Sequence, residues 1–172
     1  QRGIVAANDG NVSVKLEDGT FLCTPSGVSK AAMTPEILVH LAADGSVISA
    51  AEGYKPSSEM KMHFRCYAER EDVKAVVHAH PPIATSYASM GRALDGYQAM
   101  EFIVNLGAVP IAPYAQPSTD EVPDSIAPFL QDHDAILLAH HGALTVGDSL
   151  TRAYFRMESL EMFAKTSLYI HL

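Results

Sequence analysis

The stretch Val73-Lys74-Ala75-Val76-Val77-His78-Ala79-His80 decides the fold around which the rest of the chain is arranged. It is rich in branched apolar residues and ends at Pro81-Pro82, which is typical of a buried β-strand. Side chains two residues apart on a strand share a face, so His78 and His80 should point into one space. Two imidazoles on one face suit a metal ion, but they also suit a polar strand end that contacts water.

A second apolar run, Ala135-Ile136-Leu137-Leu138-Ala139, leads directly into His140, His141 and Gly142. A third imidazole is therefore expected at the end of another buried strand. Adjacent strand residues face opposite ways, so only one of the two histidines should join His78 and His80. The spacing does not choose between them.

A carboxylate is available at the start of a predicted helix. Pro56-Ser57-Ser58 reads as a helix start with a serine cap, which places Glu59 in the first turn. His63 lies one helical turn later on the same face, either as a fourth nitrogen ligand or as a packed polar neighbour, and we favour the neighbour. Three imidazoles and a carboxylate predict a zinc site, and the same ligands suit Mn²⁺ or Co²⁺.

Length and composition set the bounds of the chain. Its 172 residues predict one domain over 1–172. The 12 basic and 20 acidic residues form no Lys/Arg cluster, and no apolar stretch has membrane length, so we expect neither a nucleic-acid partner nor a membrane span. Cys23 and Cys66 lack CxxC spacing, which favours free thiols and a cytoplasmic location. The chain begins at Gln1 and ends at Leu172 within a helical pattern, so we expect it to be trimmed at both termini.

The remaining pattern predicts an α/β layered domain with a central, largely antiparallel sheet flanked by helices, because strands and helices mix without a regular βαβ rhythm. A hairpin is expected around Glu17-Asp18-Gly19, and a second strand pair around Asp44-Gly45. Helices are expected at 57–70, 83–90, 120–130 and from Asp148 or Ser149 onward, and extended segments at 102–111 and 135–146.

Small polar elements could bind a phosphate without a basic cluster. They are Gly10-Asn11, Thr24-Pro25-Ser26-Gly27, and Ser57-Ser58 at the predicted helix start. Hydroxyls, backbone N–H groups and the positive end of a helix dipole all attract phosphate. Taken singly, each element is equally an ordinary turn or helix cap.

Taken in order, Gly10-Asn11-Val12-Ser13, Thr24-Pro25-Ser26-Gly27, Ser57-Ser58-Glu59, His78-Ala79-His80-Pro81 and His141-Gly142 resemble the class II aldolase/adducin family. Within it, they are most similar to the L-fuculose-phosphate aldolase branch. The resemblance covers nearly the whole chain and implies the class II aldolase fold.

The resemblance also implies roles for particular residues. It makes His78, His80 and His141 the zinc ligands, in preference to His140, with Glu59 as a further ligand and the base. Tyr114, in Ala112-Pro113-Tyr114-Ala115, would be the acid at a site shared with a neighbouring subunit of a homotetramer. The implied phosphate cradle consists of Asn11, Ser26, Gly27, Ser57 and Ser58.

The implied reaction is the zinc-dependent, reversible cleavage of a ketose 1-phosphate, such as L-fuculose 1-phosphate, to dihydroxyacetone phosphate and an aldehyde through a metal-stabilised enediolate. Sugar-acid-phosphate decarboxylases and methylthioribulose-phosphate dehydratase share a similar metal site, so the resemblance also allows these activities. The ribulose-phosphate 4-epimerase branch has Asp where Glu59 stands and a Thr-His-Ala-Asp-Tyr segment that this chain lacks. Adducin-like members are non-catalytic interaction domains without the zinc ligands. Gln116-Pro117-Ser118 departs from the aldolase branch, which typically has Phe-Gly-Thr there.

Overall fold

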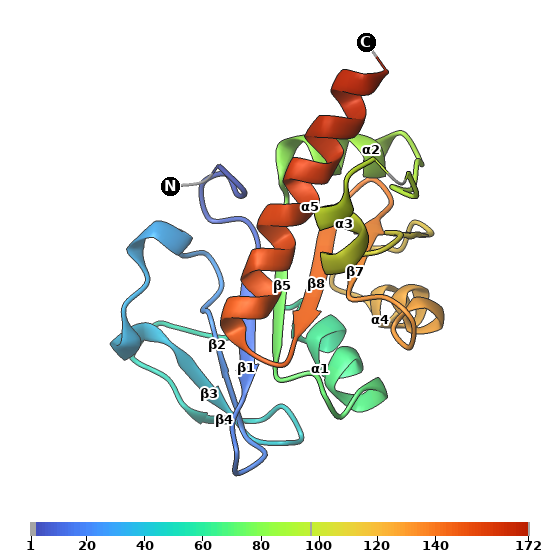
Figure 1. The fold of residues 1–172 in the computed structure, drawn as a ribbon. Coiled ribbons are helices and arrows are strands. Elements are labelled where there is room, and N and C mark those ends of the chain that lie inside the picture. The colour runs from blue at the N-terminus through green and yellow to red at the C-terminus, as the bar shows by residue number, and fades with distance from the viewer. Residues whose placement is uncertain (1–2, 97, 172) are drawn as a thin grey trace.

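The computed structural model describes residues 3–96 and 98–171, and its centre is one mixed sheet (Figure 1). Over these residues the strands lie in the order β4-β3-β2-β1-β5-β8-β7-β6. All neighbouring strands are antiparallel except β6 and β7. The bounds are β1 Asn11–Lys15, β2 Phe21–Cys23, β3 Val39–Leu41, β4 Val47–Ser49, β5 Ala75–Ala79, β6 Ile111–Ala112, β7 Ala135–Leu138 and β8 Gly142–Gly147.

Helices cover both faces of this sheet, so the fold has three layers. The helices are α1 Met60–Glu69, α2 Pro82–Ser89, α3 Met100–Asn105, α4 Glu121–Ile126 and α5 Leu150–Ile170, with short 3₁₀ turns at Lys30–Ala32, Pro35–Ile37 and Ala127–Phe129. The long α5 crosses β5 and β8 together with α2 and α3, while α1 and α4 lie on the opposite face (Figure 1). No helix in the described part of the chain is long and apolar enough to cross a bilayer.

Alternation along β5 explains why this strand is buried on both sides. Val76 packs into the core beneath α1, whereas Ala75 and Val77 pack beneath α5. His78 has the same parity as Val76 and therefore faces the α1 side. The stretch Val73–His80 thus forms a central strand that carries its histidines toward the start of α1.

The predicted layered α/β fold with a largely antiparallel sheet is confirmed, and two segment predictions are wrong. Residues 102–111 were expected to be extended, but α3 occupies Met100–Asn105 and β6 contains only Ile111–Ala112. Phe102 and Leu106 lie one helical turn apart and are both buried, and the Phe102 ring stacks on Phe163 of α5 at 4.9 Å. Packing against α5 therefore decides the conformation of an apolar run that suits either structure.

The second correction concerns 135–146, which was expected to run extended through the His-His-Gly step. The segment is instead a hairpin, because β7 ends at Leu138 and β8 begins at Gly142. His140 lies in the intervening turn with φ +56°. This left-handed conformation ends the strand and turns the chain back on itself.

Candidate active site

Two neighbouring parts of the sheet bring the predicted histidines together. His78 lies near the end of β5 and His80 directly follows that strand, while His141 comes from the turn between β7 and β8. One nitrogen of each ring lies within 4.8 Å of the others. The Nε2 atoms of His78 and His80 are 3.1 Å apart. His78 is fully buried, while His80 and His141 are partly exposed, so the cluster can be reached from one side.

Glu59, the N-cap residue of α1, closes the cluster. Its Oε1 lies 3.2 Å from His141 Nε2, and its Oε2 lies 3.3 Å from His78 Nε2. Ligands at about 2.0–2.1 Å from a tetrahedral zinc ion are themselves roughly 3.3 Å apart. The separations of 3.1, 3.2 and 3.3 Å fit that geometry, so the residues present suit a divalent transition metal.

Polar contacts outside the cluster orient two of the imidazoles. His78 Nδ1 donates to the carbonyl oxygen of Ala143 at 3.0 Å, which leaves the Nε2 lone pair directed at the cluster. His80 Nδ1 lies 3.5 Å from Asp9 Oδ2. Carbonyl and carboxylate partners of this kind are typical of metal-binding histidines.

Electrostatics favour the metal-binding forms of these candidate ligands. Burial lowers the pKa values of His78 and His80, which favours the neutral imidazole that binds a metal. Burial alone would raise the pKa of Glu59, but His141, His78 and a hydrogen bond from Asn11 outweigh it and hold this pKa below its ordinary range. Glu59 is therefore a carboxylate at neutral pH.

Two glycines permit the close approach of the strands that carry the ligands. Gly10 has φ +73°, and a Cβ there would lie 2.6 Å from the carbonyl oxygen of His78. A Cβ on Gly142 would lie 2.5 Å from His80 Cδ2. The Gly10-Asn11 and His141-Gly142 pairs are thus explained by space as well as by turns.

The predicted phosphate residues gather beside Glu59. Ser57 Oγ accepts hydrogen bonds from the Glu59 backbone N–H at 3.2 Å and from Asn11 Nδ2 at 3.3 Å. An isolated bridge between Pro25 and Pro56, with the Ser26 N–H donating to Lys55 O at 2.9 Å, brings Ser26-Gly27 against this helix start. The hydroxyls of Ser58 and Ser118 are hydrogen-bonded to each other at 2.7 Å.

Tyr114 points outward. Its side chain is 58% exposed and its hydroxyl donates to Gln116 Oε1 at 3.2 Å. Its ring lies 6.3 Å from that of His140, the histidine that the turn directs away from the cluster. A role for Tyr114 at a site shared between subunits remains a prediction.

The sequence predicted His63 as a packed polar neighbour of Glu59, but it missed the roles of Ser13 and Tyr67 behind it. His63 is hydrogen-bonded to Asn11 and Ser13, as a polar neighbour and not a member of the histidine cluster. Ser13 also contacts the Tyr67 hydroxyl. Two spacings in the sequence could have indicated this group of residues. Asn11 and Ser13 lie two residues apart on β1 and share a face, and His63 and Tyr67 lie four residues apart on α1 and share a face.

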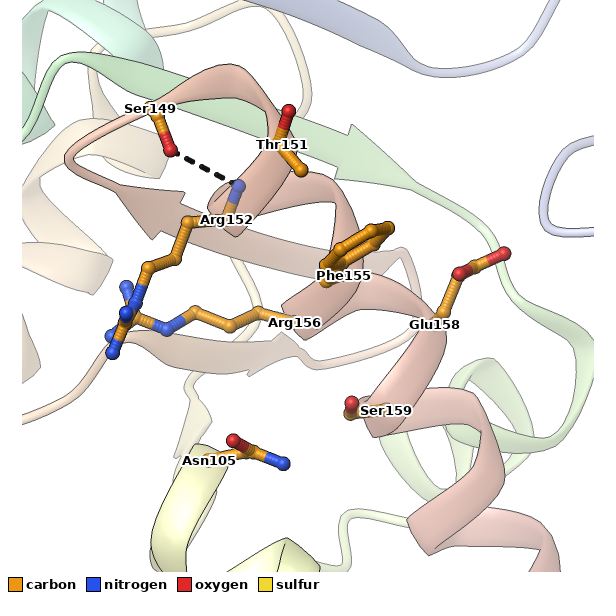
Figure 2. Close-up of a pocket in the computed structure, with 8 residues that line it drawn as sticks. All are labelled: Asn105, Ser149, Thr151, Arg152, Phe155, Arg156, Glu158 and Ser159. Carbon is orange, nitrogen blue, oxygen red and sulfur yellow. Dashed lines mark hydrogen bonds between the residues drawn. The ribbon is translucent and has the colours of Figure 1, made fainter.

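A pocket of about 510 Å³ lies along α5, away from the histidine cluster, and none of the predicted site residues lines it (Figure 2). Ser149 caps the helix there by accepting a hydrogen bond from the backbone N–H of Arg152 at 3.3 Å. Arg156 donates to Val146 O at 2.7 Å and pairs with Asp134. These contacts fix α5 to the sheet.

Comparison with known proteins finds relatives that cover nearly the whole chain. Residues 1–168 match the model of the Class II Aldolase and Adducin N-terminal domain. The chain is 35% identical to 3-oxo-tetronate 4-phosphate decarboxylase of Escherichia coli K12, covering 96% of this chain and 78% of that protein. It is 32% identical to L-fuculose phosphate aldolase of the same strain, covering 96% and 75%.

A solved structure shows the same fold. The crystal structure of YgbL from Escherichia coli superposes with a TM-score of 0.90 at 33% identity, over 99% of this chain and 83% of that one. The match to the family model, the relatives and this superposition agree on one family. The chain belongs to the class II aldolase and adducin family.

Proposed function

We propose that the chain is a zinc-dependent aldolase that reversibly cleaves a ketose 1-phosphate, similar to L-fuculose 1-phosphate, into dihydroxyacetone phosphate and an aldehyde. The observation that carries this proposal is the ionised Glu59 carboxylate, which lies against two histidines of a metal-ligand cluster and accepts a hydrogen bond from Asn11. A carboxylate in this position can move a proton beside a metal ion.

His78, His80 and His141 would hold the metal, with Glu59 as an additional ligand. Zn²⁺ suits this donor set, and Mn²⁺ and Co²⁺ suit it as well. A bound divalent cation supplies Lewis-acid stabilisation of negative charge that develops on substrate oxygen atoms.

The substrate phosphate would lie at the start of α1. Ser57, Ser58, Ser26 and Gly27 offer hydroxyl and backbone N–H donors there, and Asn11 supports the cradle by donating to Ser57 Oγ. No lysine or arginine is needed, because the positive end of the α1 dipole adds to these donors. This cradle would orient the three-carbon phosphate with its reacting carbon toward Glu59.

Glu59 would remove a proton from the hydroxymethyl carbon of dihydroxyacetone phosphate in the synthetic direction and return it during cleavage. Tyr114 of a neighbouring subunit would deprotonate the hydroxyl that becomes the aldehyde, and would protonate the same oxygen in synthesis. The site would thus be completed in a homotetramer.

Decarboxylation is the second candidate, and the 35% identity to 3-oxo-tetronate 4-phosphate decarboxylase favours it. Loss of CO₂ from a 2-hydroxy-3-oxo acid breaks the bond between the carboxyl carbon and C2. This C2 corresponds to the carbon that an aldolase separates from the aldehyde. A proton delivered to that carbon yields dihydroxyacetone phosphate in either reaction. Glu59 would serve both reactions, whereas only aldol cleavage would need Tyr114.

Proton exchange tests the shared step. The zinc-loaded protein is incubated with dihydroxyacetone phosphate in heavy water, and NMR follows the hydroxymethyl protons. We expect stereospecific loss of one proton, slowed at least about 100-fold in Glu59→Gln because a general base contributes this much or more. Glu52→Gln, which changes an exposed carboxylate, is the matched control and should exchange normally. Absence of exchange from metal-replete wild-type protein would refute the proposal.

A second measurement separates the two candidates. Aldehydes are added with dihydroxyacetone phosphate to look for aldol products, and 3-oxo-tetronate 4-phosphate is supplied separately to look for CO₂. An aldolase forms aldol product and loses this activity in Tyr114→Phe. A decarboxylase releases CO₂ at a rate that Tyr114→Phe leaves unchanged.

A further inference from the structure

A buried chain of hydrogen bonds leads from the interior of the protein to Glu59. The Tyr67 hydroxyl and Ser13 Oγ are 2.7 Å apart, and Ser13 Oγ lies 2.6 Å from His63 Nδ1. His63 Nε2 lies 2.6 Å from Asn11 Oδ1, and Asn11 Nδ2 lies 2.8 Å from Glu59 Oε2. The chain joins β1 to α1, the two elements whose ends meet at the candidate metal site.

The direction of each hydrogen bond follows from its last member. An ionised carboxylate only accepts hydrogen bonds, so the NH₂ group of Asn11 must face Glu59. Asn11 Oδ1 must then accept from Nε2–H of His63. A neutral His63 with its proton on Nε2 has an acceptor at Nδ1, so Ser13 donates to it and in turn accepts from Tyr67.

Burial makes this order obligatory. The four residues behind Glu59 are 0–5% exposed, so water cannot substitute for a missing partner. Burial lowers the pKa of His63 to about 4, which keeps its ring neutral at physiological pH. Burial also raises the pKa of Tyr67, which keeps its hydroxyl proton available for donation.

We propose that His63 is a positioning residue, supported by Ser13 and Tyr67, which fixes the amide of Asn11 so that its NH₂ group holds Glu59 Oε2. Without the Nε2–H donor of His63, the Asn11 amide can rotate and turn its oxygen toward Glu59. The amide oxygen and the carboxylate then repel each other, and the hydrogen bond to Glu59 is lost. The structural part of this proposal depends only on the hydrogen bonds, while its catalytic consequence rests on the proposed role of Glu59.

The tautomer of His63 tests the structural part without reference to activity. Long-range ¹H–¹⁵N NMR of the zinc-loaded protein at pH 7.5 distinguishes the Nε2–H and Nδ1–H forms, and His63→Gln identifies the resonances. We expect a neutral ring protonated at Nε2. A ring protonated at Nδ1, or at both nitrogens, would overturn the proposal.

Exchange of dihydroxyacetone phosphate protons tests the catalytic part. His63→Leu removes the donor and should lower kcat for exchange by roughly 10–100-fold, as loss of an outer-shell partner typically does, with KM nearly unchanged. His63→Gln keeps an N–H donor for Asn11 and should recover most of kcat. Ser13→Ala should give a smaller decrease in kcat than His63→Leu, and Tyr67→Phe a smaller one still. Both variants keep the helix packing, so they test the proposal if His63→Leu fails to fold.

Thr145→Val is the matched control, because Thr145 is equally buried and donates to Ala153 O at 2.8 Å on the α5 side of the sheet. It should lower stability without lowering kcat. Equal kcat losses in His63→Leu and Thr145→Val, or no recovery in His63→Gln, would show that His63 is merely structural. If wild-type protein shows no exchange, the proposed function fails, and the tautomer measurement still decides the hydrogen-bond chain.

Discussion

At the scale of single residues, Gly142 controls how closely β8 approaches the proposed metal ligands. In Gly142→Ala the new Cβ would lie 2.5 Å from His80 Cδ2 and 2.6 Å from Ala79 O, so His80 must move. We expect the zinc affinity to fall at least about 10-fold, because ligand position is lost while every ligand remains. Competition with a fluorescent chelator measures the affinity. Gly19→Ala, a strained change in the β1–β2 turn at φ +83°, should leave it unchanged, and an unaltered affinity in Gly142→Ala would contradict the prediction.

His63 should make the stability of the metal-free protein depend on pH. Its pKa is about 4 when folded and 6.5 when unfolded, so the unfolded chain binds the proton first as the pH falls. The stabilising contribution is therefore fully present above pH 6.5 and is lost between pH 6.5 and 4, amounting to about 3 kcal/mol. Urea unfolding in EDTA at several pH values measures it. His63→Gln should flatten the profile by that amount, and an unchanged slope would show that His63 is not buried in neutral form.

Residue identity predicted part of the site. The period of a strand was enough to pair His78 with His80. The predicted helix start lies near Glu59, but Glu59 is the N-cap of α1 and does not lie in its first turn. Alternation could not choose between His140 and His141, because both lie in a turn whose φ of +56° at His140 no strand rule anticipates. The hydrogen bonds of His63 were equally invisible, since Ser13 and Asn11 are about fifty residues away in the sequence.

At the scale of elements, α2 is capped by another helix. Its N-cap residue is Pro81, which provides no side-chain cap, and the Glu161 carboxylate of α5 instead accepts hydrogen bonds from Ile83 N and Ala84 N at 2.9–3.1 Å. Glu161→Ala should lower the free energy of unfolding by about 2 kcal/mol, because hydrogen bonds to a charged group are lost at a helix N-terminus. Urea denaturation at pH 7.5 measures the change. Glu161→Gln should lose less and Glu52→Ala almost nothing, and equal effects in all three would refute this capping role.

Helices and strands were predicted well where the sequence pattern was compatible with only one of the two structures. Val73–His80 is too short and too branched for a helix, and it forms β5 as expected, although the strand begins at Ala75. The stretch 102–111 had no such constraint, and α3 forms there because Phe102 packs on Phe163, sixty-one residues later. Contacts between distant elements decide such segments, and local propensity carries no information about them.

At the scale of the whole molecule, the exposed apolar residues of α3 and α5 favour assembly. Met100, Val104, Phe155 and Met162 are 55–80% exposed, and such side chains gather at protein interfaces more often than on the free surface of a monomer. If Tyr114 acts at a neighbouring subunit's Glu59, the sites lie between chains. The homotetramer then predicts a result that a single-chain site cannot give.

Mixing two inactive variants tests this arrangement. Glu59→Gln and Tyr114→Phe subunits are unfolded, mixed in equal amounts and refolded together, and aldol cleavage is assayed. A site that takes Glu59 from one chain and Tyr114 from another recovers about a quarter of wild-type activity, because each wild-type residue is present with a chance of about one half. Each variant refolded alone should stay inactive. If the mixture is no more active than its components, then either both residues act in one chain or Tyr114 takes no part in the reaction. Tyr114→Phe protein that still decarboxylates would show that Tyr114 takes no part.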